Sequence, residues 1–173
     1  MESRSKFLGH PAHVILIVFP LGLLSTALTF DFVARLQKKE KKKRKLSEAA
    51  YLMLGAGLLG GLAAAPFGFW DWLAIPKNTR AKRVGAAHGV GNVLALLLFG
   101  ASWLLRRKAP QEDNNAALGL ALAGGVLTGA TSWLGAELVE RLGVGVYPGA
   151  HLDSPSSLRN RDAHETSHDD ELA

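Results

Sequence analysis

The chain has 173 residues, a formal net charge of +5 and no cysteine. The absence of cysteine excludes disulfides, thiolate metal sites and any iron–sulfur cluster held by this chain alone. Hydrophobic residues make up 48% of the sequence, and they gather in long runs, whereas a soluble core would spread them over short amphipathic segments. The composition therefore predicts an integral membrane protein whose main partner is the lipid bilayer.

Four apolar stretches each exceed the length of about 20 residues that a membrane-spanning helix needs. They cover approximately residues 11–34, 49–75, 84–105 and 116–139. The first stretch is longer than the apolar region of a signal peptide, which has about 7–15 residues, so we expect it to be retained. The sequence predicts an all-α membrane protein with an antiparallel four-helix transmembrane bundle in residues 1–147. A polar, flexible tail is predicted for residues 148–173.

Asp31 lies near the end of the first span, one helical turn before Arg35. Side chains four positions apart share a helix face, so we expect a local ion pair and a structural role for Asp31. A basic block follows at residues 38–45. In a soluble protein such a block would suggest nucleic acid, but between two spans it indicates membrane topology, and no nucleic-acid partner is expected.

The distribution of Lys and Arg predicts the orientation, because these residues collect on cytoplasmic flanks. Eleven flank the first and third connections: Arg35, Lys38, Lys39, Lys41, Lys42, Lys43, Arg44, Lys45, Arg106, Arg107 and Lys108. Six lie on the opposite flanks: Arg4, Lys6, Lys77, Arg80, Lys82 and Arg83. The bias predicts a multi-pass cell-membrane protein with both termini outside the cytoplasm, and the basic second connection acts in the opposite direction.

Five ionisable residues fall at one end of the predicted bundle. They are His10, His13, Asp71, His88 and Glu137. The histidines precede or begin the first and third spans and the carboxylates end the second and fourth, so antiparallel helices bring all five to one rim. Ionisable groups near hydrocarbon cost roughly 3 kcal/mol at the centre of a helix, and they are seldom kept there without a partner or a role. Any function is therefore expected at this rim.

Imidazoles and carboxylates together resemble a ligand shell for a divalent metal such as zinc, iron or manganese, or imidazole ligands for a haem b. His13 and His88 are the predicted principal ligands, and the other three rim residues complete or orient the shell. Asn92, one turn after His88, faces the same way and either orients a histidine or packs within the bundle. Taken singly, each rim residue is equally consistent with contact to headgroups and water.

Three pairs of glycines have the spacing that lets membrane helices approach closely. They are Gly57 with Gly61, Gly85 with Gly89, and Gly125 with Gly129. We expect them to pack helices within one chain, and contact between copies in a homo-oligomer is the alternative.

The tail contains His164-Glu165-Thr166-Ser167-His168, which has the H-E-x-x-H spacing of zinc proteases. Its surroundings are polar and lack the apolar periodicity that would bury a helix around a catalytic zinc. We therefore expect no protease activity, and no catalytic residue is predicted in this chain.

A set of short motifs is spread over the spans and their ends. They are Gly9-His10-Pro11-Ala12-His13, Phe19-Pro20-Leu21-Gly22, Asp31, Gly68 with Asp71, His88 with Asn92, Gly135-Ala136-Glu137-Leu138-Val139 and Gly143-Val144-Gly145-Val146. Over about residues 8–152 the chain resembles the bacterial membrane protein family catalogued as domain of unknown function 2231. It departs from the family pattern at Leu142, where relatives often have histidine, and at Ala136, where glycine is common. If the histidine of relatives is a ligand, the corresponding site in this chain lacks one ligand, because residue 142 is leucine.

The family's four-helix pattern is similar to that of diheme cytochrome b membrane proteins, and the resemblance implies a redox partner. No histidine lies in the halves of the spans that are nearer the predicted cytoplasmic side. At most one haem therefore fits, near the opposite rim. We expect an accessory or electron-handling subunit with a metal or a single haem. The alternative is a structural subunit that docks onto a larger membrane complex without a cofactor. A transporter or channel has little support, because no span carries a central charge and no pair of broken helices is evident.

Overall fold

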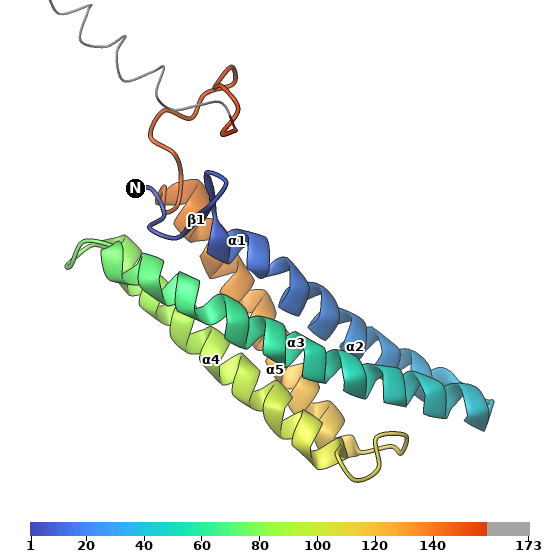
Figure 1. Ribbon diagram of the computed structural model, residues 1–173. Coiled ribbons are helices and arrows are strands. Elements are labelled where there is room, and N and C mark those ends of the chain that lie inside the picture. Colours follow the sequence, from blue (N-terminus) through green and yellow to red (C-terminus); the bar gives the residue numbers. More distant parts are fainter. Residues whose placement is uncertain (159–173) are drawn as a thin grey trace, which may run out of the picture.

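The computed structural model describes residues 1–158 as a bundle of antiparallel helices (Figure 1). Within these residues, four helical segments are long and apolar enough to cross a membrane. The first comprises α1 (Ala12–Leu16) and α2 (Val18–Leu36), and the others are α3 (Glu40–Ala74), α4 (Arg80–Arg106) and α5 (Asn115–Ala136), which a π-helical turn, η1 (Glu137–Arg141), extends. The predicted all-α transmembrane architecture is confirmed.

Local sequence signals account for the helix limits. The side chains of Thr79 and Asn114 each accept a hydrogen bond from the backbone amide three residues later, which caps the first turns of α4 and α5. Pro20 has no amide hydrogen to donate to the carbonyl of Leu16, and α1 gives way to α2 in this turn. The first span is therefore two helices in sequence, where the sequence predicted one.

Helix α3 is longer than a membrane span. Its 35 residues extend about 52 Å, against a hydrocarbon thickness of about 30 Å. The first turns of α3 contain the basic residues 41–45, so most of the predicted basic connection is helical and continuous with the second span. The helix is therefore longer than the hydrocarbon is thick, and its basic first turns need no contact with lipid tails.

A cluster of buried apolar side chains from several helices forms the hydrophobic core. It is formed by Leu24, Ala27, Leu54, Phe99 and Ala121. At four of the paired glycines a neighbouring side chain occupies the space that a Cβ atom would need. Leu24 lies against Gly57, Leu96 against Gly61, Trp72 against Gly85 and Leu28 against Gly125. Gly89 and Gly129 have nothing in the described residues within 4 Å of that site. Packing within one chain therefore accounts for four of the six predicted glycines.

A small antiparallel hairpin covers the end of the bundle opposite the basic turns. Its strands are β1 (Lys6–Phe7) and β2 (His10–Pro11). Residues 142–158 follow η1 at the same end without a further helix (Figure 1). The predicted tail thus begins outside the bundle, and the His164–His168 motif lies outside the described residues.

Candidate functional site

His13 lies in the first turn of α1 and packs against α3. Its Nδ1 lies 3.0 Å from the carbonyl oxygen of Ala64. Because a carbonyl only accepts, Nδ1 carries a hydrogen and donates it to this oxygen. A Cβ atom at Gly68 would lie 2.7 Å from Cε1 of the imidazole. The ring therefore occupies space that only glycine leaves free.

His88 on α4 repeats this arrangement against α5. Its Nδ1 lies 2.8 Å from the carbonyl oxygen of Thr131, and a Cβ atom at Gly135 would lie 3.1 Å from Cε1 of the ring. In both cases the glycine follows the accepting residue by four positions, which is one helical turn. Each pair of consecutive spans thus holds one imidazole in the same way, with its Nδ1–H group donating to a backbone carbonyl.

The two imidazoles come together inside this end of the bundle. Their ring centres are 6.4 Å apart and their planes lie at 85° to each other. Two imidazoles that bind one metal from opposite sides, each at a metal–nitrogen distance of about 2 Å, have ring centres about 6 Å apart. The separation of His13 and His88 is therefore close to that of two ligands of a single metal.

Hydrogen bonds link His88, Asn92 and Thr131 in a closed ring. The amide of Asn92 donates to Nε2 of His88 over 3.0 Å, and the hydroxyl of Thr131 donates to Oδ1 of Asn92 over 2.7 Å. Asn92 thus faces the same way as His88, as predicted from its position one turn later. Both ring nitrogens of His88 are engaged, whereas Nε2 of His13 has no hydrogen-bond partner in residues 1–158.

Asp71 lies at the same end but binds the N-terminal segment. It accepts hydrogen bonds from the hydroxyl of Ser3 at 2.7 Å and from the backbone amides of Arg4 and Ser5 at 2.7 and 3.2 Å. Three donors to one carboxylate fix the path of the chain before β1. Asp71 is therefore an anchor for this segment on α3.

Glu137 and His10 also have partners of their own. Glu137 accepts a hydrogen bond from Arg80 at 2.6 Å, and the exposed His10 lies 3.1 Å from the hydroxyl of Ser157. In the part of the chain that the structure describes, no three His, Asp or Glu side chains are grouped so that they could hold a metal ion. Of the five predicted shell residues, the structure brings two imidazoles together and directs the other three to separate partners.

At the basic end of the bundle, Asp31 pairs with Arg106. Nη1 of Arg106 donates to Oδ1 of Asp31 over 2.6 Å, and the two side chains are only 6% and 8% exposed. Arg35 is exposed and donates to Asn115 instead. The predicted Asp31–Arg35 pair is wrong, because Asp31 faces the interior, which the side chain of Arg106 enters from α4. A count of flanking charges gives no sign that Arg106 turns inward.

Both histidines and all the spanning helices lie within a segment that matches a known family. The family model, described as a predicted membrane protein (DUF2231), matches residues 9–148. The chain belongs to the DUF2231 family. The description of DUF2231 as a membrane protein agrees with the four helices that are long and apolar enough to span a bilayer. No curated protein and no solved structure matches the chain.

Proposed function

We propose that this DUF2231 protein binds one metal centre between His13 and His88 and serves as an accessory or electron-handling subunit in the membrane. The 6.4 Å separation of the two rings carries the proposal. The hydrogen bonds from Nδ1 to the carbonyls of Ala64 and Thr131 support it. Histidines that bind metals almost always donate their other N–H group to a carbonyl or carboxylate, which fixes the ring and its tautomer.

The donor set favours haem iron over a bare divalent ion. Zinc sites take three or four protein ligands, whereas a haem brings its own equatorial nitrogens and needs axial ligands alone from the protein. Two imidazoles without a nearby free carboxylate fit the second requirement. A bound haem supplies one-electron chemistry, and His13 and His88 would hold its iron. A divalent ion would need water or another molecule to complete its coordination.

The test is the cofactor content of the protein purified in mild detergent from cells that make haem. We expect a Soret band and stoichiometric iron. His13→Ala and His88→Ala should each lose the band. His10→Ala is the matched control and should keep it, because His10 is exposed and its imidazole bonds to Ser157. Protein with neither a haem band nor a stoichiometric metal would overturn the proposal.

A structural subunit that docks onto a larger membrane complex is the second candidate. It is favoured by the hydrogen bonds of His88, since Asn92 and Thr131 already satisfy both ring nitrogens without any cofactor. In this case His88→Ala would reduce the yield of proteins that co-purify from membranes and would change no optical spectrum. Loss of the spectrum with unchanged partners would favour the cofactor.

A further inference from the structure

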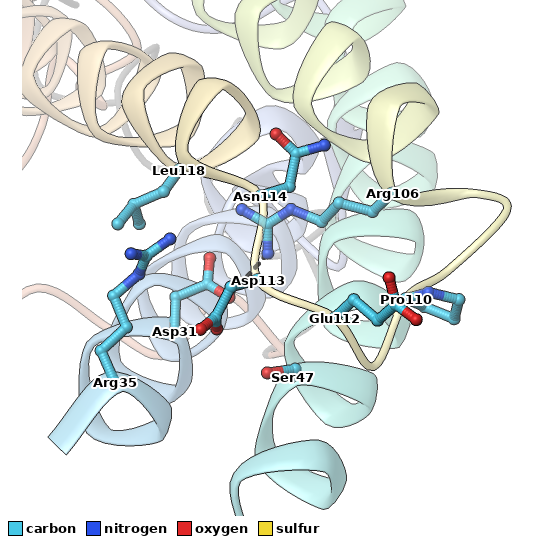
Figure 2. Close-up of a pocket in the computed structure, with 9 residues that line it drawn as sticks. All are labelled: Asp31, Arg35, Ser47, Arg106, Pro110, Glu112, Asp113, Asn114 and Leu118. Atoms are coloured by element: carbon cyan, nitrogen blue, oxygen red, sulfur yellow. Dashed lines mark hydrogen bonds and ion pairs between the residues drawn. The ribbon is translucent and has the colours of Figure 1, made fainter. Parts of the chain in front are cut away.

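Three carboxylates at the basic end of the bundle line a small cavity (Figure 2). They are Asp31, Glu112 and Asp113, and the volume of the cavity is about 20 Å³, roughly the space of one water molecule. Asp31 forms an ion pair with Arg106, and Asp113 forms one with Lys43. Two of the basic side chains at this end are therefore paired with carboxylates that line the cavity.

A second, larger hollow lies on the surface of the first turns of α3, and we name it the α3 groove. Its volume is about 430 Å³, and it is lined by Glu40, Lys41, Arg44, Lys45, Glu48 and Gln111. Lys41, Arg44 and Lys45 are exposed, and none of them forms an ion pair within residues 1–158. Glu48 accepts a hydrogen bond from Gln111 at 3.1 Å. The α3 groove therefore presents three cations without carboxylate partners in the described residues.

The α3 groove lies in line with apolar side chains that face outward from the same helix. Lys45, Leu52 and Leu59 follow one another at intervals of seven positions, which places them on one face of α3. Leu52 and Leu59 are 63% and 69% exposed, and they belong to a helix that is apolar enough to span a membrane. Lys45 is about 10 Å along the helix from Leu52. A lipid whose acyl chains contact these leucines therefore has its headgroup near the groove.

Aromatic side chains mark the level of the membrane surface on α3. Tyr51 stacks on Trp103 of α4, with ring centres 5.3 Å apart and planes at 4° to each other. Trp72 follows Tyr51 after about 31 Å of helix, which matches the hydrocarbon thickness of about 30 Å. Trp and Tyr are enriched at both membrane–water interfaces. Arg44 and Lys45 lie about 10 Å beyond the level of Tyr51, where their long side chains reach lipid headgroups.

We propose that the α3 groove binds the phosphate of an anionic phospholipid, with Arg44 and Lys45 as the main contacts and Lys41 at the outer edge. Arginine presents paired N–H donors to phosphate oxygens, and lysine acts as a point charge. Basic clusters beside a membrane helix attract anionic lipids. A lipid is favoured over free phosphate, because its acyl chains also cover the exposed leucines in line with the groove. The groove is at the opposite end of the bundle from His13 and His88, so either proposal can fail without the other.

The test is native mass spectrometry of the full chain in mild detergent, with dioleoylphosphatidylglycerol as the anionic lipid. Dioleoylphosphatidylcholine has the same acyl chains and no net charge, and it should bind roughly 10-fold more weakly. The double variant Arg44→Gln with Lys45→Gln should weaken binding of the anionic lipid roughly 10- to 30-fold. Arg107→Gln with Lys108→Gln is the matched control, because it removes the same charges from exposed positions outside the groove. It should change the affinity less than about 3-fold.

Glu48→Gln is a further variant that acts in the opposite direction. It removes a negative charge from the groove and keeps an acceptor for Gln111, so it should tighten binding of the anionic lipid roughly 2- to 5-fold. Weaker binding in this variant overturns the proposal. Equal binding of the two lipids, or equal losses in the two double variants, also overturns it. Displacement of the lipid by millimolar inorganic phosphate would show that the groove takes free phosphate and would overturn the assignment to a lipid.

Discussion

Asn92 donates its side-chain amide to Nε2 of His88, one helical turn earlier on α4, over 3.0 Å. This nitrogen carries the lone pair that His88 would offer to a metal, because its other nitrogen donates to the carbonyl of Thr131. A metal centre between the histidines therefore competes with Asn92 for the same lone pair. Nε2 of His13 has no such competitor in residues 1–158. A metal would therefore displace a hydrogen bond at His88 but not at His13.

Replacing Asn92 should strengthen cofactor binding. The hydrogen bond to His88 contributes about 0.5–1.5 kcal/mol, so its removal in Asn92→Leu should tighten haem binding roughly 2- to 10-fold. The measurement is titration of haem into cofactor-free protein in detergent. Asn115→Leu, at an exposed asparagine of the opposite end, is the matched control and should leave the affinity unchanged. Weaker binding in Asn92→Leu would show that Asn92 positions His88 for its ligand.

The glycine under His13 should not tolerate a methyl group. In Gly68→Ala the new Cβ would lie 2.7 Å from Cε1 of the imidazole, so the ring must move away from Ala64. Overpacking of this kind costs about 1–3 kcal/mol. We expect a lower melting temperature by circular dichroism and loss of any bound cofactor. Gly129→Ala should be neutral or gain up to about 1 kcal/mol, because nothing lies within 4 Å of its Cβ position and alanine favours helix. Equal effects at the two sites would contradict the close packing at Gly68.

The ion pair between Asp31 and Arg106 should show strong coupling. Asp31→Leu leaves a buried guanidinium without its partner and should lower the free energy of unfolding by about 3–5 kcal/mol. The double variant Asp31→Leu with Arg106→Met should recover most of this loss, because two apolar side chains need no partner. The coupling is measured by unfolding the unchanged chain, Asp31→Leu, Arg106→Met and the double variant in mixed micelles. Arg35→Met should cost less than about 1 kcal/mol, since Arg35 is exposed. Additive effects of the two single changes would contradict the pairing.

The sequence predicted correctly how far along its helix each of these side chains lies. It did not predict which neighbouring helix each side chain faces. Apolar run length and alternating direction place His13, Asp71, His88 and Glu137 at one end, because axial position follows from the rise of 1.5 Å per residue. The face that each side chain presents depends on how neighbouring helices pack. Asp31 therefore shares a helix with Arg35 and yet pairs with Arg106.

The partners of the rim carboxylates lie in segments without periodicity. Asp71 is bound by residues 3–5, which precede the first span and show no helical pattern, and Glu137 pairs with Arg80 at the start of α4. The sequence therefore could not separate the two imidazoles that meet from the carboxylates that do not. One signal was present, since Gly68 and Gly135 each lie where an imidazole needs room.

Asp71 should be dispensable for cofactor binding but needed to hold the N-terminal segment. Asp71→Ala removes three hydrogen bonds to residues 3–5. We expect faster hydrogen exchange in residues 1–11 with little change in the spanning helices. Glu140→Ala, at an exposed carboxylate of the same end, is the control. If Asp71→Ala lost a bound metal, this result would show that Asp71 is one of the ligands.

The absolute orientation can be tested cleanly because the chain contains no cysteine. Single cysteines at Lys77 and Glu112, both exposed, report on the second and third connections. The Lys and Arg bias predicts that Lys77→Cys reacts with a membrane-impermeant maleimide in intact cells. Glu112→Cys should react only after the membrane is opened. The reverse labelling would invert the orientation and leave the histidine pair intact, since His13 and His88 share one end in either case. Labelling of both cysteines from the same side would contradict the crossing of α4.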